Sequence, residues 1–221
     1  MGKYWKDIRE KTAGLNRKET CAYILTYYWY HVLIFVSIVA LFLLFGVHYG
    51  FKNKKPVFTC LVVNQEIDTV RDHEMAESFA KQAGLPKDRV VIDSDYNFSY
   101  DGLQLEGVNE SSYEKLFFQW QNQQIDAMIM SESFYMHCKE MGGGFHILDG
   151  QDTEGLTAYM DSGKCTAVVL GNDSFTELLS GKKDEKLLLA FPSSGKHTEE
   201  NRRFLAYMKN QLEKADKGEG N

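Results

Sequence analysis

The polar side chains best placed to contact a ligand follow the apolar runs of this sequence, where predicted strands end. Six such residues carry amide, hydroxyl or carboxylate groups: Asn64, Gln65, Ser131, Glu132, Ser133 and Asn172. Amides and hydroxyls both donate and accept hydrogen bonds, which suits a small polar ligand. Because open α/β sheets bind ligands beyond the carboxyl ends of their strands, we expect a ligand site there. The alternative is that all six are ordinary turn and cap residues.

Other groups of chemically active residues depart from known patterns. The stretch from Asp93 to Asp101 resembles a calcium-binding loop, but Phe98 occupies the position that needs Gly. His137 and Cys138 are adjacent, and adjacent residues on a helix point about 100° apart, so they are poorly placed to share a metal. The sequence contains neither a Gly-rich phosphate loop nor a nucleophile elbow. We therefore expect no enzyme activity, no metal ion and no cofactor.

The elements that would position the six residues alternate between strands and helices. The apolar, β-branched run 57–63 predicts a strand covered on both faces, and 89–93 predicts a second strand. Between them, apolar residues at helical spacing predict a helix that Asp68 or Thr69 caps. Strand–helix–strand units with short connections favour parallel neighbours.

The middle of the chain continues this alternation. Ser111 and Glu114 have the spacing of a capping box at a helix start. That helix leads into an apolar strand over 126–130, and Ser131 or Ser133 then caps the next helix.

The last third of the chain predicts more strands and one long helix. We expect a strand at 145–148, a hairpin around 161–164, another strand at 186–191 and a final helix that starts near Thr198. The predicted fold class is α/β: a mixed, mostly parallel sheet with helices on both faces, plus one N-terminal transmembrane helix.

The uncharged run from Val32 to Val47 predicts that transmembrane helix. Its 16 residues span about 24 Å as a helix, and aromatic residues on both flanks complete the crossing. A buried core helix is the alternative, but it is disfavoured because no Asp, Glu, Lys or Arg occurs from residue 21 to residue 51. No small-x-small cleavage site follows, so we expect a signal anchor over 27–51 rather than a cleaved signal peptide.

The charge distribution gives the predicted orientation. Residues 1–30 carry six of the 25 Lys and Arg and three of the 31 Asp and Glu, and the remainder lie in the acidic body 51–221. The larger positive flank should stay in the cytoplasm. We expect a cytoplasmic basic segment (1–26), a linker (52–56), an extracytoplasmic domain (57–213) and a flexible tail (214–221) of a cell-membrane protein. The basic segment is either an interfacial helix or a solvated tail.

The four cysteines are Cys21, Cys60, Cys138 and Cys165, and their spacing fits no CxxC pattern. The sequence leaves open whether Cys138 and Cys165 form a disulfide or are free, as buried cysteines commonly are.

Two stretches of the body resemble extracytoplasmic solute-binding proteins. One is "QQIDAMIMSESFYMHCKEMGGGFHILDG"; the other combines "CTAVVLGNDSF" with "KLLLAFPSSGKHTEENRRFLAYM". The pattern, over about residues 57–210, is similar to a reduced, membrane-anchored bacterial form of the type 2 periplasmic-binding-protein-like superfamily. The resemblance implies solute binding and transport. The body is short for two complete lobes, so one lobe is expected to be abridged.

These observations predict a single-pass membrane protein whose extracytoplasmic domain recognises a ligand or a partner without catalysis. The expected partners are the lipid bilayer, a transporter permease or other membrane protein, and a small polar ligand. The acidic body excludes nucleic acid, whose binding needs clustered Lys and Arg. The alternative is an accessory subunit of a transporter or envelope complex that uses the domain as an interaction surface. An external hydrolase is a third alternative.

Overall fold

The computed structural model describes residues 2–27, 29–49, 55–102, 104–105, 108–170 and 185–216. The chain divides into two compact units, Met1–Lys54 and Lys55–Asn221. Each unit is described by itself.

The N-terminal unit is helical: α1 (Gly2–Lys11), α2 (Arg17–Tyr27) and α3 (Trp29–Val47). A reciprocal pair of bonds begins α2. The Glu19 N–H donates to Asn16 Oδ1 and the Asn16 N–H donates to Glu19 Oε2, both at 3.0 Å. This capping box satisfies two N–H groups that have no acceptor within the helix, so α2 has a sharp start that the sequence analysis missed.

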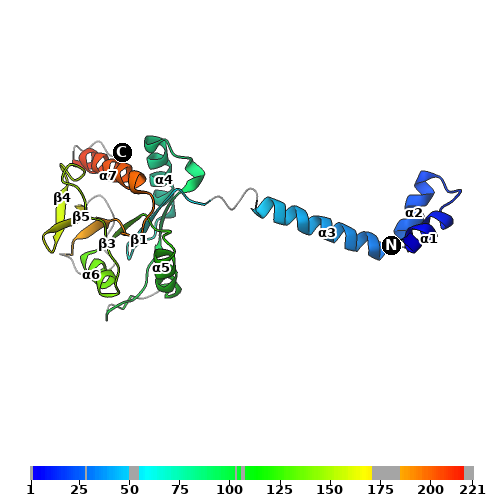
Figure 1. Ribbon diagram of the computed structural model, residues 1–221, viewed down its shortest axis with the longest axis horizontal. Coiled ribbons are helices and arrows are strands. Elements are labelled where there is room, and N and C mark those ends of the chain that lie inside the picture. The colour runs from blue at the N-terminus through cyan, green and yellow to red at the C-terminus, as the bar shows by residue number, and fades with distance from the viewer. Residues whose placement is uncertain are drawn as a thin grey trace. The chain divides into compact units, whose positions relative to one another are not determined.

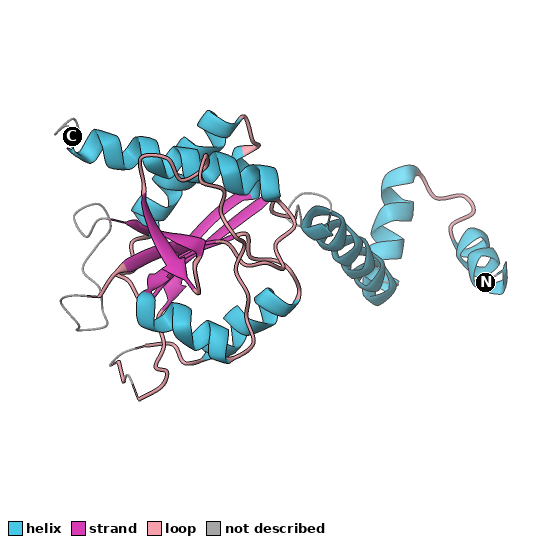
Figure 2. Cartoon of the chain, turned by 60° about the vertical axis from the view of Figure 1, so that its left-hand side comes forward, coloured by secondary structure: helices cyan, strands magenta, loops and turns pink. Residues whose placement is uncertain are grey.

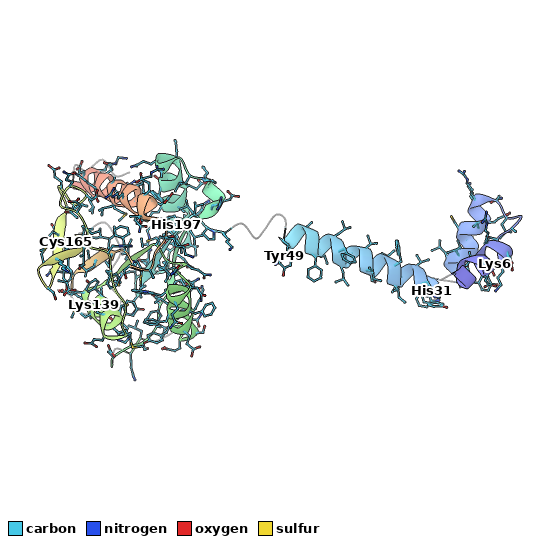
Figure 3. The ribbon with its side chains drawn as sticks, in the orientation of Figure 1. Lys6, His31, Tyr49, Lys139, Cys165 and His197 are labelled. Carbon is cyan, nitrogen blue, oxygen red and sulfur yellow. The ribbon has the colours of Figure 1, made fainter. Side chains whose placement is uncertain are left out.

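Among the described residues, α3 is the one helix that is long and apolar enough to cross a membrane. Its 19 residues span about 28 Å, close to the thickness of a bilayer's hydrocarbon core. Figure 3 shows His31 and Tyr49 towards its two ends. Helices of this kind near an N-terminus serve as membrane anchors or as signal sequences.

The body is built on one six-stranded sheet with the order β2-β1-β3-β6-β5-β4. Its strands are β1 (Phe58–Val63), β2 (Val90–Tyr96), β3 (Ala127–Ser131), β4 (Thr157–Asp161), β5 (Lys164–Leu170) and β6 (Leu187–Ala190). The pairs β1–β2 and β1–β3 are parallel, and the other three pairs are antiparallel. The mixed α/β class is confirmed, but the expectation of a mostly parallel sheet is wrong.

The antiparallel half follows from its connections. Ser162 and Gly163 form the tight turn between β4 and β5, with φ of 51° and 78°. Such a turn can join only antiparallel strands, whereas the helical crossovers between β1, β2 and β3 keep those strands parallel. β6 starts at the edge where β5 ends, with Leu187 paired to Leu170, so it runs back between β5 and β3.

Helices cover both faces of the sheet (Figures 1 and 2): α4 (Thr69–Ala83) and α7 (Thr198–Asp216) lie on one face, and α5 (Ser111–Gln121) and α6 (Glu132–Glu140) lie on the other. A 3-10 turn, η2 (Lys87–Arg89), precedes β2. On the first face, the rings of Phe58, Phe79 and Phe204 lie 4.8 to 5.0 Å apart, centroid to centroid. Such aromatic pairs each contribute about 0.5–1.5 kcal/mol beyond the burial of apolar area.

Two of the predicted helix N-caps are confirmed and one is wrong. Asp68 caps α4 as predicted and accepts the Val70 and Arg71 N–H groups, and Ser131 caps α6 by accepting the Phe134 N–H. The capping box predicted at Ser111 is wrong.

Two local features replace what was predicted. The Ser111 hydroxyl bonds to Asn109 Oδ1 at 2.6 Å instead of capping α5. The strand expected at 145–148 is reduced to a single bridge between Phe145 and Pro192. All four cysteines are free, so Cys138 and Cys165 are not bonded to each other.

Candidate functional site

The carboxyl edge, where β1, β2 and β3 end, holds the first predicted ligand residues. Asn64 is buried, and its side chain pairs with Phe98 at both ends: Nδ2 donates to the Phe98 carbonyl at 3.1 Å and Oδ1 accepts the Phe98 N–H at 2.9 Å. Gln65 is also buried and donates to the Asn64 carbonyl at 2.9 Å. Its own carbonyl accepts from Asn97 Nδ2 at 2.9 Å. These two residues hold the segment that follows β2 against the end of β1.

The serines after β3 form a second polar cluster at this edge. The Tyr100 hydroxyl lies 2.7 Å from Ser133 Oγ and 3.3 Å from Ser131 Oγ. The Ser133 N–H donates to Glu185 Oε1 at 2.6 Å, and the Glu132 N–H donates to the Lys186 carbonyl at 2.9 Å. The start of α6 is therefore already bonded to the chain that enters β6.

The structure thus brings five of the six predicted residues to one edge. Val62 pairs with Ile129, so Asn64 and Ser131 end neighbouring strands. Asn172 lies outside the described residues. Asn97 Oδ1, which is buried at this edge, has no hydrogen-bond partner among the described residues. Most of the polar groups bond to the protein itself, and ligand binding here stays a prediction.

Nearby titratable groups are poorly suited to nucleophilic chemistry. His137 is buried between the Asp101 carboxylate and the Tyr113 hydroxyl, which lies 2.9 Å from Nε2. Burial raises the pKa of Tyr113, and burial likewise raises the pKa of the Cys138 thiol. Both groups therefore stay protonated, which removes the thiolate or phenolate that an attack needs. Within the described ranges, no three His, Cys, Asp or Glu side chains are grouped to hold a metal ion.

The amino edge, where β1, β2 and β3 begin, contains a cavity of about 520 Å³. It lies between the first turns of α7 and the segment 146–152, with Phe191 beside them just after β6. Its apolar wall is made by four side chains: Ile147, Leu148, Phe191 and Leu205. Its volume lies within the range of small-molecule sites, about 300–1,000 Å³.

Asn201 is the polar residue that distinguishes this cavity. The residue is 6% exposed, and neither its Nδ2 nor its Oδ1 has a hydrogen-bond partner among the described residues. His146 Nε2, also in the lining, is buried without a partner as well. Leaving such a group unpaired costs about 1–3 kcal/mol, and native proteins rarely tolerate it without a reason. Two residues of the lining, Asn201 and His146, therefore hold buried polar atoms that no described residue satisfies.

Charged side chains of both signs also line this cavity. Arg202 Nε lies 3.2 Å from Asp152 Oδ2, and Asp149 adds a second carboxylate. Thr198, the first residue of α7, is part of the lining. The first N–H groups of a helix have no acceptor within it and carry partial positive charge.

A hydrogen bond between His197 and Asp126 fixes the start of α7 to the sheet. His197 Nδ1 lies 2.8 Å from Asp126 Oδ1, and Asp126 Oδ2 accepts the Thr59 N–H at 2.9 Å. Figure 3 shows His197 where the α7 ribbon begins. Burial raises the pKa of Asp126, while its bonds to Thr59 and His197 act in the opposite direction. Asp126 thus positions the helix whose next turn carries Asn201.

Gly195 allows close backbone packing in the segment between β6 and α7. A Cβ at this position would lie 3.1 Å from the Pro192 carbonyl oxygen and 3.3 Å from the Ile125 carbonyl oxygen. The chain between β6 and α7 therefore passes close to the start of β3.

The sequence analysis missed the cavity, although one signal was present. Asn201 lies three residues before Phe204 and four before Leu205, on the buried stripe of α7. A polar residue on an apolar helix face needs a partner or a function. His146 gave no comparable signal, because the segment around it was expected to be a strand.

Comparisons with known proteins found no match: no family model, no curated protein and no solved structure matches this chain. The resemblance to solute-binding proteins stays a prediction.

Proposed function

We propose that this protein is a single-pass membrane protein whose extracytoplasmic body binds a small polar ligand and catalyses no reaction. The observation that carries the proposal is the amino-edge cavity, whose volume lies within the range of small-molecule sites. Its lining includes Asn201, whose buried amide has no partner among the described residues. The raised pKa values of the Cys138 thiol and the Tyr113 hydroxyl support a role in binding rather than in chemistry.

The membrane part of the proposal rests on α3 and on the charges around it. The helix crosses the bilayer, and the basic residues before it hold the N-terminal side in the cytoplasm. The acidic body then lies outside. Cytoplasmic orientation of the body would contradict this arrangement.

Cysteine labelling tests the orientation. Both proteins carry Cys165→Ser, because Cys165 is a half-exposed thiol of the body. Cys21 is exposed on the N-terminal side, and Glu140→Cys, made with Cys21→Ser, places an exposed thiol on the body. A membrane-impermeant maleimide should label the second protein in intact cells, and label Cys21 only after permeabilisation. The reverse pattern would overturn the orientation, and loss of the N-terminal residues from the mature chain would identify α3 as a signal sequence.

Ligand capture tests the binding function. The full chain and its Asn201→Leu variant are purified in parallel, denatured, and the released small molecules compared by mass spectrometry. We expect a compound that accompanies the wild type and the control variant Asn210→Leu but not Asn201→Leu. Asn210 is an exposed asparagine on the same helix, which makes it a matched control. Equal release from all three proteins would argue against the cavity as the ligand site.

A second candidate function is that of an accessory subunit of a transporter or envelope complex. The observation that favours it is that the described residues of the body form a single sheet, which gives one lobe without a second lobe among them to close over the carboxyl edge. Gentle solubilisation of native membranes followed by size analysis separates the candidates. A stable larger complex that survives the Asn201→Leu substitution would favour the accessory role.

A further inference from the structure

We propose that the body forms a symmetric dimer in which β4 of one copy pairs with β4 of a second copy, which joins the two sheets into one. The contact uses the outer side of β4, defined as the side of the strand that faces away from β5. Figure 1 shows β4 as the outermost strand at its end of the sheet. The dimer goes beyond the proposed ligand binding and does not depend on the cavity.

The outer side of β4 carries backbone groups that no other strand of the described residues pairs. β4 is last in the sheet order and pairs with β5 alone. Asp161 and Lys164 flank a two-residue turn, so they exchange backbone hydrogen bonds with each other. The direction of these groups alternates along a strand, so the N–H and carbonyl groups of Ala158 and Met160 point away from β5.

The side chains of β4 leave this side accessible. Thr157, Ala158 and Met160 are exposed, and Met160 is exposed to 57%. The ring of Tyr159 lies 5.4 Å from that of Tyr135 on α6, centroid to centroid. Because successive side chains point to opposite faces, Ala158 and Met160 lie on the other face of the sheet from α6.

A second copy of the strand is complementary to this side. In an antiparallel pair centred on Tyr159, Ala158 of each copy lies opposite Met160 of the other, and each such pair exchanges both of its backbone hydrogen bonds. All the open groups of the two residues are then satisfied. The long side chain of Met160 also packs against a small one, which covers part of its exposed apolar surface.

The charges of β4 are compatible with self-pairing. Asp161 is the one charged residue of the strand, and its carboxylate forms an ion pair with Lys139 of α6. The same register places Asp161 opposite Thr157 of the second copy, so the two Asp161 residues lie about 13 Å apart along the strands. This separation exceeds the Debye length of about 8 Å at physiological ionic strength.

The strand at the other side of the sheet, β2, is protected against the same contact. Its middle residue is Asp93, and Asp95 follows two residues later. Self-pairing about the middle of β2 would place Asp93 opposite its own copy, and like charges directly opposite each other are destabilising. Outer strands commonly avoid pairing through charged residues, above all Lys, or through Pro, and β4 contains no Lys, Arg or Pro. The contrast indicates that β4 is the side left open to a partner.

Cysteine cross-linking tests the contact and its register. Tyr159→Cys and Thr157→Cys are made separately in the full chain, with Cys21→Ser and Cys165→Ser to remove the two thiols that are not buried. Each protein is oxidised in the membranes of the expressing cells.

The predicted register separates the two variants. Tyr159 lies opposite its own copy, where Cβ atoms are about 4.5–5.5 Å apart, near the span of a disulfide. The two copies of Thr157 lie about 13 Å apart. We expect at least tenfold more disulfide-linked dimer from Tyr159→Cys than from the matched control Thr157→Cys. Equal cross-linking by both variants, or none by either, would overturn the proposed pairing.

A proline variant tests the backbone bonds without changing Tyr159. Ala158→Pro removes an outward N–H from each copy and keeps the bonds between β4 and β5, a place where a sheet tolerates proline. Light scattering of the detergent-solubilised full chain should give a dimer for the wild type and for the control Ala158→Ser. Ala158→Pro should weaken self-association at least tenfold, with an unchanged circular dichroism spectrum. A monomeric wild type would overturn the proposal, and a dimer that persists in Ala158→Pro would assign self-association to another part of the chain.

Discussion

Two buried asparagines, one at each edge of the sheet, differ in whether their side-chain amides are hydrogen-bonded. Asn64 at the carboxyl edge is 1% exposed and has both amide atoms bonded to Phe98, whereas Asn201 at the amino edge is 6% exposed and has neither amide atom bonded to any residue that the structure describes. The first amide therefore stabilises the fold, and the second imposes a free-energy cost on it. A residue that costs stability where an apolar side chain would fit is a better candidate for function than one that is fully satisfied.

The two edges also differ in whether the sequence predicted a ligand site there. Strand ends and helix starts made the carboxyl edge the expected ligand site, yet the protein uses most of those polar groups to join its own segments. At the amino edge, Asp126 and His197 bond to each other, whereas the amide of Asn201 on the same helix has no partner among the described residues. The following predictions test this contrast, all measured by urea unfolding of the full chain in lipid nanodiscs.

Asn64→Ala should give the largest effect, a loss of about 2–4 kcal/mol in the free energy of unfolding, because it leaves the Phe98 N–H and carbonyl unpaired in a buried site. Asn64 also has a φ of 53°, a conformation that Asn tolerates better than Ala. The exposed Asn210→Ala is the control. A loss below about 0.5 kcal/mol would show that the carboxyl edge is not held by this amide.

Tyr100→Phe should cost about 1–2 kcal/mol, since the hydroxyl bonds to Ser131 and Ser133 are lost while the ring stays packed. The ring lies 4.9 Å from that of Phe134, and this contact is unchanged by the substitution. Restored stability in a Tyr100→Phe, Ser133→Ala double variant would confirm that the hydroxyls act as a pair. An unchanged midpoint in the single variant would contradict the bonded state of this edge.

Asn201→Leu should raise the free energy of unfolding by about 1 kcal/mol in ligand-free protein, because it replaces an unpaired buried amide with an apolar side chain of similar size. This sign is opposite to that expected for Asn64. Destabilisation by more than about 1 kcal/mol would show that Asn201 has a structural role, and the contrast between the two edges would disappear.

Asp126→Asn should change the pH dependence of stability, the smallest of the four effects. Burial raises the pKa of Asp126 above its ordinary value of 3.8, so the folded state binds this proton more tightly than the unfolded state does. That contribution is complete below pH 3.8 and is lost as the pH rises through the folded pKa. Between these limits the wild type should lose stability relative to Asp126→Asn, and parallel curves for the two proteins would contradict the prediction.

Much of the architecture was predictable from local patterns. The period of apolar residues gave the strands and helices of the body, and short polar side chains gave the caps at Asp68 and Ser131. The direction of β6 was not predictable, because the residues of a strand do not determine which neighbouring strand it pairs with. The capping box at Asn16 and Glu19 is also a local pattern of short polar side chains, but it was not predicted.

Some features of the candidate site were likewise predictable from the sequence, and others were not. The sequence by itself determined that α3 is long and apolar enough to cross a membrane, and that polar residues gather at the ends of β1 and β3, because both follow from neighbouring residues. Only the tertiary structure decided which polar atoms are satisfied. Asn64 meets Phe98 across 34 positions, and the cavity joins the segment that begins at His146 to Asn201 on α7. Long-range packing sets those distances, and pairing within the fold, rather than residue type, determines whether a buried amide stabilises the protein or is left without a partner.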